Sequence, residues 1–79
     1  MIKEDLLGYL AYSGGADAVE VADSMESTYF AASMALLRLC RQSLASRHID
    51  PDTGIYWYAL TERGEERLAY LESETPPRR

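Results

Sequence analysis

The stretch STYFAASMALLRLCRQSL, residues 27–44, decides the fold that this sequence predicts. At about 100° per residue, most of its apolar side chains fall on one side of a helix. We expect that side to face a core, and it consists of Tyr29, Ala32, Leu36, Leu39 and Cys40. The opposite side collects Phe30, Ala31, Met34, Arg38 and Arg41, with Leu37 at its edge. The stretch therefore predicts one helix, which Ser27 or Thr28 can cap.

Two further helices are predicted before this stretch. Residues 2–12 have apolar side chains at helical spacing, and Gly14 and Gly15 end the segment. The side chains expected to point inward from it are Ile2, Leu6, Leu7, Tyr9 and Leu10. Asp17 and Glu20 have the spacing of a capping box, which predicts a short helix up to about Met25.

After residue 44 the apolar period changes from 3.6 to 2. Residues 46–49 and 55–60 read as two strands around the turn formers of residues 50–54. Tyr56, Tyr58 and Leu60 are expected to point inward, and Ile55 and Trp57 outward. Thr61 then caps a last helix whose inner stripe is Gly64, Leu68 and Leu71.

The predicted fold class is α+β and mostly helical. A core of three helices is followed by a β-hairpin and a C-terminal helix, all in one domain of residues 1–72. Residues 73–79 contain two prolines and no apolar side chain besides them, so we expect a disordered tail.

Charge is segregated along the chain. The formal net charge of the whole chain is −5. Residues 1–26 carry a net charge of −5, and residues 50–79 carry −3. Residues 27–49 carry +3, from Arg38, Arg41 and Arg47, and contain no acidic residue. A polyanion would be repelled by most of this chain, so a nucleic-acid contact is expected at the middle segment.

The composition favours a cytoplasmic protein. A single cysteine excludes an internal disulfide, and the acidic N-terminus does not resemble a signal peptide. No window approaches the ~18 apolar residues of a membrane span. We expect no membrane partner.

Two motifs carry a resemblance to a known family. Leu36-x-x-Leu39-x-x-x-x-Leu44 leads out of the central helix, and Tyr58-Ala59-Leu60-Thr61-Glu62-Arg63-Gly64 joins the hairpin to the last helix. Together they resemble the winged helix-turn-helix transcriptional regulators, broadly the MarR and PadR groups. The resemblance implies that the central helix lies in the major groove of double-stranded DNA and that the hairpin is the wing. The residues expected to contact DNA are Ser27, Thr28, Tyr29, Ser33, Arg38, Arg41 and Arg47.

The sequence departs from that family in three respects. Ala31 and Met34, which match reading positions, are apolar, although bases are usually read by Arg, Lys, Asn or Gln. Asp50 and Asp52 place negative charge at the tip of the wing, and Ser43 stands where glycine is usual. An alternative function is therefore a protein-interaction module that docks through Phe30, Met34, Leu37 and Trp57.

The alternatives for these apolar side chains stay open. Phe30 and Leu37 can instead tuck against the hairpin or the second helix, and Trp57 can cover a neighbouring apolar group.

A homodimer is expected to form through the first and last helices, using Tyr9, Tyr12, Tyr70 and Leu71.

No catalytic or metal constellation is present in the sequence. Cys40 reads as an inert buried thiol and His48 as a lone histidine, while residues 50–54 read as a turn and not as a calcium loop. We expect no enzymatic activity and no cofactor.

Overall fold

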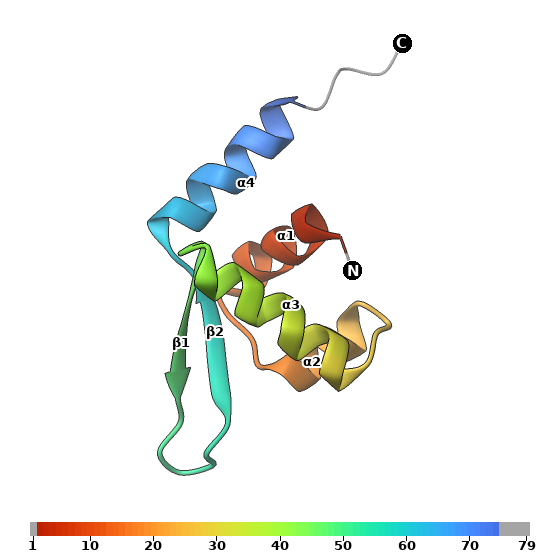
Figure 1. Ribbon diagram of the computed structural model, residues 1–79, viewed down its shortest axis with the longest axis vertical. Coiled ribbons are helices and arrows are strands. Elements are labelled where there is room, and N and C mark those ends of the chain that lie inside the picture. The colour runs from red at the N-terminus through yellow and green to blue at the C-terminus, as the bar shows by residue number, and fades with distance from the viewer. Residues whose placement is uncertain (1, 75–79) are drawn as a thin grey trace.

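A computed structural model describes residues 2–74 of the 79-residue chain. Three helices are followed by two strands and a fourth helix (Figure 1). They are α1 (Lys3–Ser13), α2 (Ala18–Ser24), α3 (Tyr29–Arg41), β1 (Ala45–Ile49), β2 (Tyr56–Leu60) and α4 (Glu62–Glu74). The predicted fold class is confirmed. Within the described residues, no helix is both long enough and apolar enough to span a membrane.

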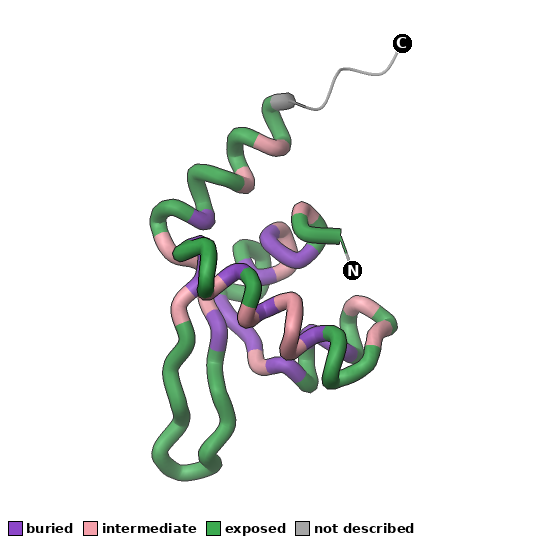
Figure 2. Tube along the Cα trace, viewed as in Figure 1, coloured by how far each residue is buried: buried purple, intermediate pink, exposed green. Residues whose placement is uncertain are grey.

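The core lies between the first three helices and the base of the hairpin. Leu7 and Leu36 are completely buried, and Tyr58 brings the hairpin into the same cluster. Figure 2 shows that burial ends abruptly, because the outer half of the hairpin and most of α4 are exposed. The hairpin therefore extends from the core as a wing.

Three helices begin at the residues that the sequence predicts. Asp17 Oδ1 accepts a hydrogen bond from the Glu20 N–H at 2.8 Å, and Glu20 Oε1 accepts one from the Asp17 N–H at 3.1 Å. The hydroxyl oxygen of Thr28 accepts from the Ala31 N–H at 3.0 Å and so caps α3. Thr61 does the same for α4. These bonds satisfy N–H groups that a helix start leaves without partners.

The turn from α3 into β1 is tied to the start of α4. Ser43 adopts a φ of 63°, a left-handed conformation that favours glycine. Its carbonyl accepts a hydrogen bond of 2.7 Å from the Thr61 hydroxyl. Gly64 is buried against the backbone of Leu44. The end of the central helix and the start of the last helix are thus joined by a side-chain hydrogen bond and a close backbone contact.

The two strands pair antiparallel, with Arg47 opposite Tyr58 and Ile49 opposite Tyr56. Ala16, between α1 and α2, adds a single bridge to Tyr58, and each N–H donates to the other carbonyl at 2.9 and 2.8 Å. The sequence does not predict this bridge. It fixes β2, and with it the wing, to the segment between the first two helices.

Two expectations, one about burial and one about helix length, are wrong. Ile2 is 66% exposed because it precedes α1. Tyr56 does share the inward face of Tyr58, as expected, and lines a groove with α2 and α3, but it is 41% exposed because it lies beyond the core on the outer part of the hairpin. Helix α4 includes Ser73 and Glu74, which were expected to belong to the tail. The rest of that tail, residues 75–79, lies outside the described residues.

Candidate nucleic-acid interface

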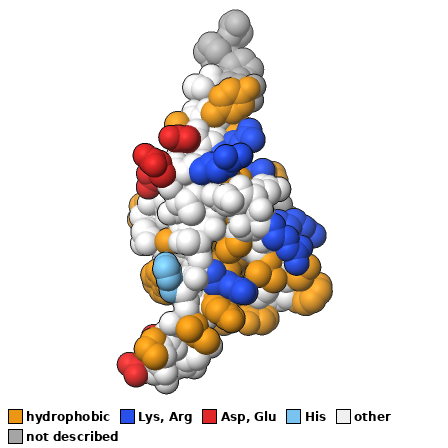
Figure 3. All heavy atoms as spheres, turned by 60° about the vertical axis from the view of Figure 1, so that its left-hand side comes forward, with side chains coloured by type: hydrophobic (Ala, Val, Ile, Leu, Met, Phe, Trp, Pro, Cys, Tyr) orange, Lys and Arg blue, Asp and Glu red, His pale blue; other side chains and the backbone are white. Residues whose placement is uncertain are grey.

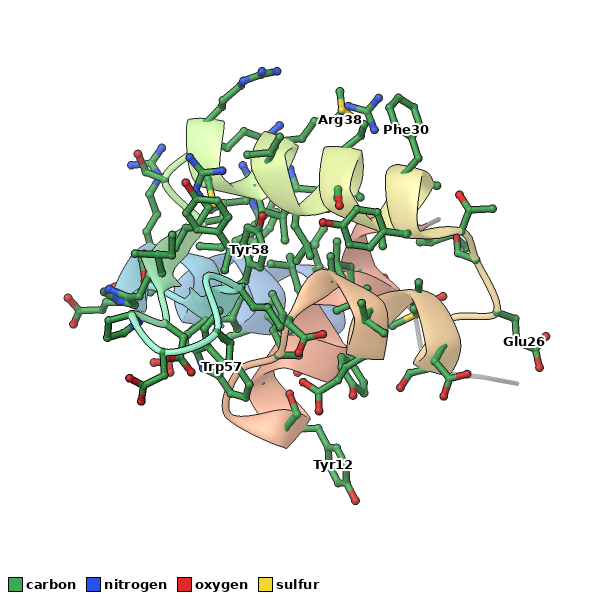
Figure 4. The ribbon with its side chains drawn as sticks, turned by 90° about the horizontal axis from the view of Figure 1, so that it is seen from below. Tyr12, Glu26, Phe30, Arg38, Trp57 and Tyr58 are labelled. Carbon is green, nitrogen blue, oxygen red and sulfur yellow. The ribbon has the colours of Figure 1, made fainter. Side chains whose placement is uncertain are left out.

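The outer side of α3 carries Phe30, Met34 and Arg38, which form one row because they are four residues apart. Phe30 is 73% exposed, Arg38 is exposed and Met34 is half-buried. Figure 4 shows Phe30 and Arg38 projecting from α3 away from the rest of the domain. The alternative in which Phe30 tucks against the hairpin or α2 is therefore wrong.

Tyr29 is also exposed, although the helical angle assigns it to the core side. Its exposed fraction is 63%, because it is the first residue of α3 and lies at the edge of the domain. It lines an apolar groove of about 170 Å³ together with Val19 of α2 and Ile55 and Tyr56 of the hairpin. The groove places aromatic rings between the central helix and the wing.

The remaining predicted reading residues offer only hydroxyl groups for hydrogen bonding. The Thr28 hydroxyl oxygen is already engaged in the cap of α3. Ser27 is half-buried, and its N–H donates to the Ala22 carbonyl at 2.8 Å. Ser33 is half-buried. The exposed surface of the first half of α3 is therefore mainly apolar.

Arg47 lies on β1 and is held over an aromatic ring. Its guanidinium carbon is 4.1 Å from the centre of the Tyr56 ring. Its positive charge also acts on Cys40, which is half-buried near the end of α3. Burial raises the pKa of the Cys40 thiol, and the charge of Arg47 opposes that rise. Arg47 therefore lies on the wing and close enough to α3 for its charge to act on Cys40.

Arg41 belongs to a second basic surface that the sequence does not predict. It lines a cleft of about 540 Å³ with Lys3 of α1 and with Arg63 and Arg67 of α4. Figure 3 shows Lys and Arg side chains on one side of the molecule from α4 down to the hairpin, with acidic side chains at the edge of α4 and at the wing tip. Lys3, Arg63 and Arg67 come from segments that are acidic in sum, so their grouping depends on the fold.

The wing tip is a hydrogen-bonded turn. Asp50 Oδ1 accepts from the Asp52 N–H at 2.9 Å, and Gly54 has a φ of 74° that suits a tight reversal. Within residues 2–74, no group of three or more His, Cys, Asp or Glu residues could hold a metal ion. Both acids of the tip are exposed.

Solved structures decide what this arrangement is. No protein-family model and no curated protein matches the sequence. The YusO protein of Bacillus subtilis superposes with a TM-score of 0.85 at 21% identity, covering 90% of this chain and 51% of that one. A MepR A103V mutant from Staphylococcus aureus gives 0.83 at 27% identity, with 90% and 53% covered. MarR C80S of Escherichia coli, complexed with operator DNA, gives 0.83 at 17%, with 90% and 51% covered. The fold is a MarR-like winged helix.

The winged helix spans about half the length of the solved chains that it matches. Those proteins include chains described as transcriptional regulators, from Silicibacter pomeroyi and Streptomyces coelicolor, and not as enzymes. This agrees with the lack of catalytic motifs in the sequence.

Trp57 of the winged helix lies on the outer face of β2, as predicted, and covers a glycine. Its indole ring packs where a side chain at Gly15 would stand, and it is 43% exposed. The alternative in which Trp57 covers a neighbouring group is therefore the one that the structure supports. Gly15 has a φ of 130° and no side chain, and it leaves room for the ring.

The four residues expected at a dimer contact are not equally accessible. Tyr12 is 90% exposed and Tyr70 is 53% exposed. Tyr9 and Leu71 are half-buried and pack against the core, where α1 and α4 contact each other. In this winged helix, α4 runs outward from the body of the domain (Figure 1).

Proposed function

We propose that this chain is a cytoplasmic DNA-binding protein that regulates transcription. In this proposal α3 enters the major groove of duplex DNA and the hairpin contacts the flanking backbone. The observation that carries the proposal is the placement of Arg38 and Arg47. Both are exposed, one on the outer row of α3 and one on the wing, in a segment without acidic residues. The likeness to a winged helix solved with operator DNA supports it.

The charges of these two arginines are available to a ligand. Among the described residues, neither arginine forms an ion pair with a carboxylate. Lys and Arg side chains that neutralise phosphates release counterions, and this release supplies much of the affinity of a protein for DNA. Asp50 and Asp52 at the wing tip would be repelled by phosphate, so the wing contacts DNA through Arg47, in the middle of β1.

A gel-shift titration of mixed-sequence duplex in low salt tests the proposal. The double variant R38A/R47A should bind more weakly, on the order of tenfold for each lost contact at 0.1 M salt. R63A/R67A is the matched control, because it removes two exposed arginines from α4 and changes the net charge equally. R63A/R67A should lose less affinity than R38A/R47A, because Arg63 and Arg67 line the cleft beside Arg41 and lie on neither the outer row of α3 nor the wing.

Two results would contradict this function. Absence of binding by the wild-type chain at low salt would exclude duplex DNA as its ligand. Equal losses in R38A/R47A and R63A/R67A would mean that total charge, and not the α3 and wing surface, governs retention. Circular dichroism of each variant should show an unchanged fold, since all four arginines are exposed.

We also propose that the chain acts as a homodimer that pairs through α1 and α4. The exposed ring of Tyr12 and the outward course of α4 support this pairing. Sedimentation equilibrium of the wild-type chain should give a dimer mass, and Y12E/Y70E should give a monomer. A monomeric wild-type protein would exclude the pairing.

A protein-interaction module is the second candidate function. It is favoured by the exposure of Phe30, because large apolar side chains on a surface often mark interfaces. Met34 and Leu37 are half-buried beside it, while Trp57 rests on Gly15. This function predicts that M34E abolishes a stable complex with a partner protein but that R38A/R47A does not. Loss of the complex in R38A/R47A alone would argue against it.

A further inference from the structure

The first half of α3 presents an apolar surface where a DNA-reading helix usually presents amides or guanidinium groups. Phe30 is 73% exposed and Ala31 is exposed, and Met34 follows one turn later. Between Tyr29 and Leu37 there is no Arg, Lys, Asn or Gln. Such a surface cannot make the bidentate hydrogen bonds by which guanine and adenine are read.

The nearby hydroxyl groups, including that of the exposed Tyr29, each have a single O–H and do not form such bidentate pairs. The oxygen of Thr28 accepts the capping hydrogen bond from Ala31 at 3.0 Å, and Ser33 is half-buried. Arg38 lies two turns along the helix from Phe30, in the same row. The row thus begins with an apolar contact and ends with a positive charge.

Charge complementarity indicates what covers this row. Arg38 continues it, and Arg47 stands on the adjacent wing, with no acidic residue from 27 to 49. An apolar partner protein would not need these flanking charges, whereas a nucleic-acid groove offers both phosphates and one apolar group. That group is the 5-methyl of thymine, which points into the major groove.

We infer that Phe30, Ala31 and Met34 read thymine methyl groups in the major groove. The inference rests on the proposed DNA-binding function and names the chemical feature that the reading helix selects. Phe30 and Met34 are separated by roughly 6 Å along the helix axis. Adjacent base pairs are about 3.4 Å apart, so this separation corresponds to about two base-pair steps. From Phe30 to Arg38 the row extends roughly 12 Å, which is about the width of the major groove.

The test compares duplexes that differ in these methyl groups alone. Duplexes that the wild-type protein retains from a random pool are resynthesised with deoxyuridine in place of thymidine, which keeps base pairing and removes the methyl. Binding is measured by fluorescence anisotropy at constant salt. Removing one contacted methyl should weaken binding about fourfold, because a buried methylene contributes about 0.8 kcal/mol and 1.4 kcal/mol is tenfold.

The variant F30A/M34A locates the effect on α3. It should bind thymidine and deoxyuridine duplexes equally, at about the affinity of the wild-type protein for the deoxyuridine duplex. Ser46→Ala, on β1 and outside the row, should retain the full preference for thymidine. Thermal melting should show that F30A/M34A folds, and F30A alone repeats the test if the double variant does not, because Phe30 is largely exposed.

The outcomes separate this inference from the function on which it rests. Equal wild-type affinity for both duplexes, with binding still lost in R38A/R47A, would overturn the reading of methyl groups and leave DNA binding intact. A preference for thymidine that persists in F30A/M34A would also overturn it. Absence of binding to either duplex would overturn both the inference and the proposed function.

Discussion

The guanidinium carbon of Arg47 lies 4.1 Å from the centre of the Tyr56 ring. The register pairs Arg47 with Tyr58, so the contact is diagonal across the hairpin, on one face of the sheet. A cation over an aromatic ring at an exposed site contributes about 0.5–1 kcal/mol. The contact therefore restrains the guanidinium on the wing before any ligand arrives.

Replacing Arg47 should change how DNA binding responds to salt. The slope of log K against log salt concentration is negative. If Arg47 neutralises one phosphate, R47A makes this slope less steep by about 0.9. Tyr56→Phe keeps the ring and should keep the wild-type slope. The measurement is a set of gel-shift titrations between about 50 and 200 mM salt, a range over which DNA affinity changes strongly. An unchanged slope in R47A would remove this residue from the interface.

Neutralising the wing tip should strengthen DNA binding. D52N removes one negative charge from the wing tip. It keeps the backbone N–H of residue 52, which donates a hydrogen bond to Asp50 Oδ1. The gain should be on the order of twofold at low salt and should vanish at high salt, because exposed charges are screened. Glu72→Gln makes the same charge change on α4 and should have little effect. A larger gain from Glu72→Gln would place DNA near α4 and not near the wing.

Ser43 stands in a conformation that glycine adopts more readily, at a φ of 63°. S43G should raise the free energy of unfolding by about 1 kcal/mol, because a side chain in the left-handed region is strained. Ser33→Gly makes the same chemical change inside α3 and should lower stability by about 0.5 kcal/mol. Urea denaturation gives both values. If both variants lost stability, the strain at Ser43 would be relieved by its surroundings.

Two glycines in helices should respond oppositely to alanine. A side chain at Gly64 would overlap the Leu44 backbone, so G64A should destabilise the fold by about 1–3 kcal/mol. Gly8 of α1 has open space around it, and G8A should stabilise the fold by about 0.5–1 kcal/mol. Thermal melting of the two variants gives the comparison. A G64A variant as stable as the wild-type protein would show that the junction between α3 and α4 can move apart without loss of stability.

The Cys40 thiol should react slowly. Burial raises its pKa above the ordinary value of 9.0, and Arg47 lowers it again. R47A should therefore raise the pKa further and slow alkylation by iodoacetamide at pH 8.5, since the thiolate is the reactive form. Because the folded pKa lies above the unfolded one, the stability from the neutral thiol is present below 9.0 and lost as the pH rises. Faster alkylation in R47A would contradict this ordering.

Local signals in the sequence predict most of the fold. The caps at Asp17, Thr28 and Thr61 depend on hydrogen bonds that reach three residues along the chain, so spacing alone identifies them. The buried positions of α3 follow equally from the helical period, as Leu36 and Leu39 show.

The predictions that fail depend on which neighbours are within reach. The helical angle assigns Tyr29 to the core side, but the first turn of α3 lies beside an open groove at the edge of the domain, where Tyr29 is 63% exposed. Likewise, Lys3 and Arg67 lie more than sixty positions apart in acidic segments, and the packing of α1 against α4 brings them to one cleft. Periodicity contains no information about either relationship.

The indole of Trp57 supplies the protein with a built-in spectroscopic reporter. It is the single tryptophan of the chain and rests on Gly15, between the hairpin and the segment that leads into α2. Its emission therefore comes from one place, where the wing meets the helical body. A ligand that shifts the hairpin will change the wavelength and quenching of this signal without any added label. Stopped-flow fluorescence of the unmodified chain can thus time the motion of the wing on binding.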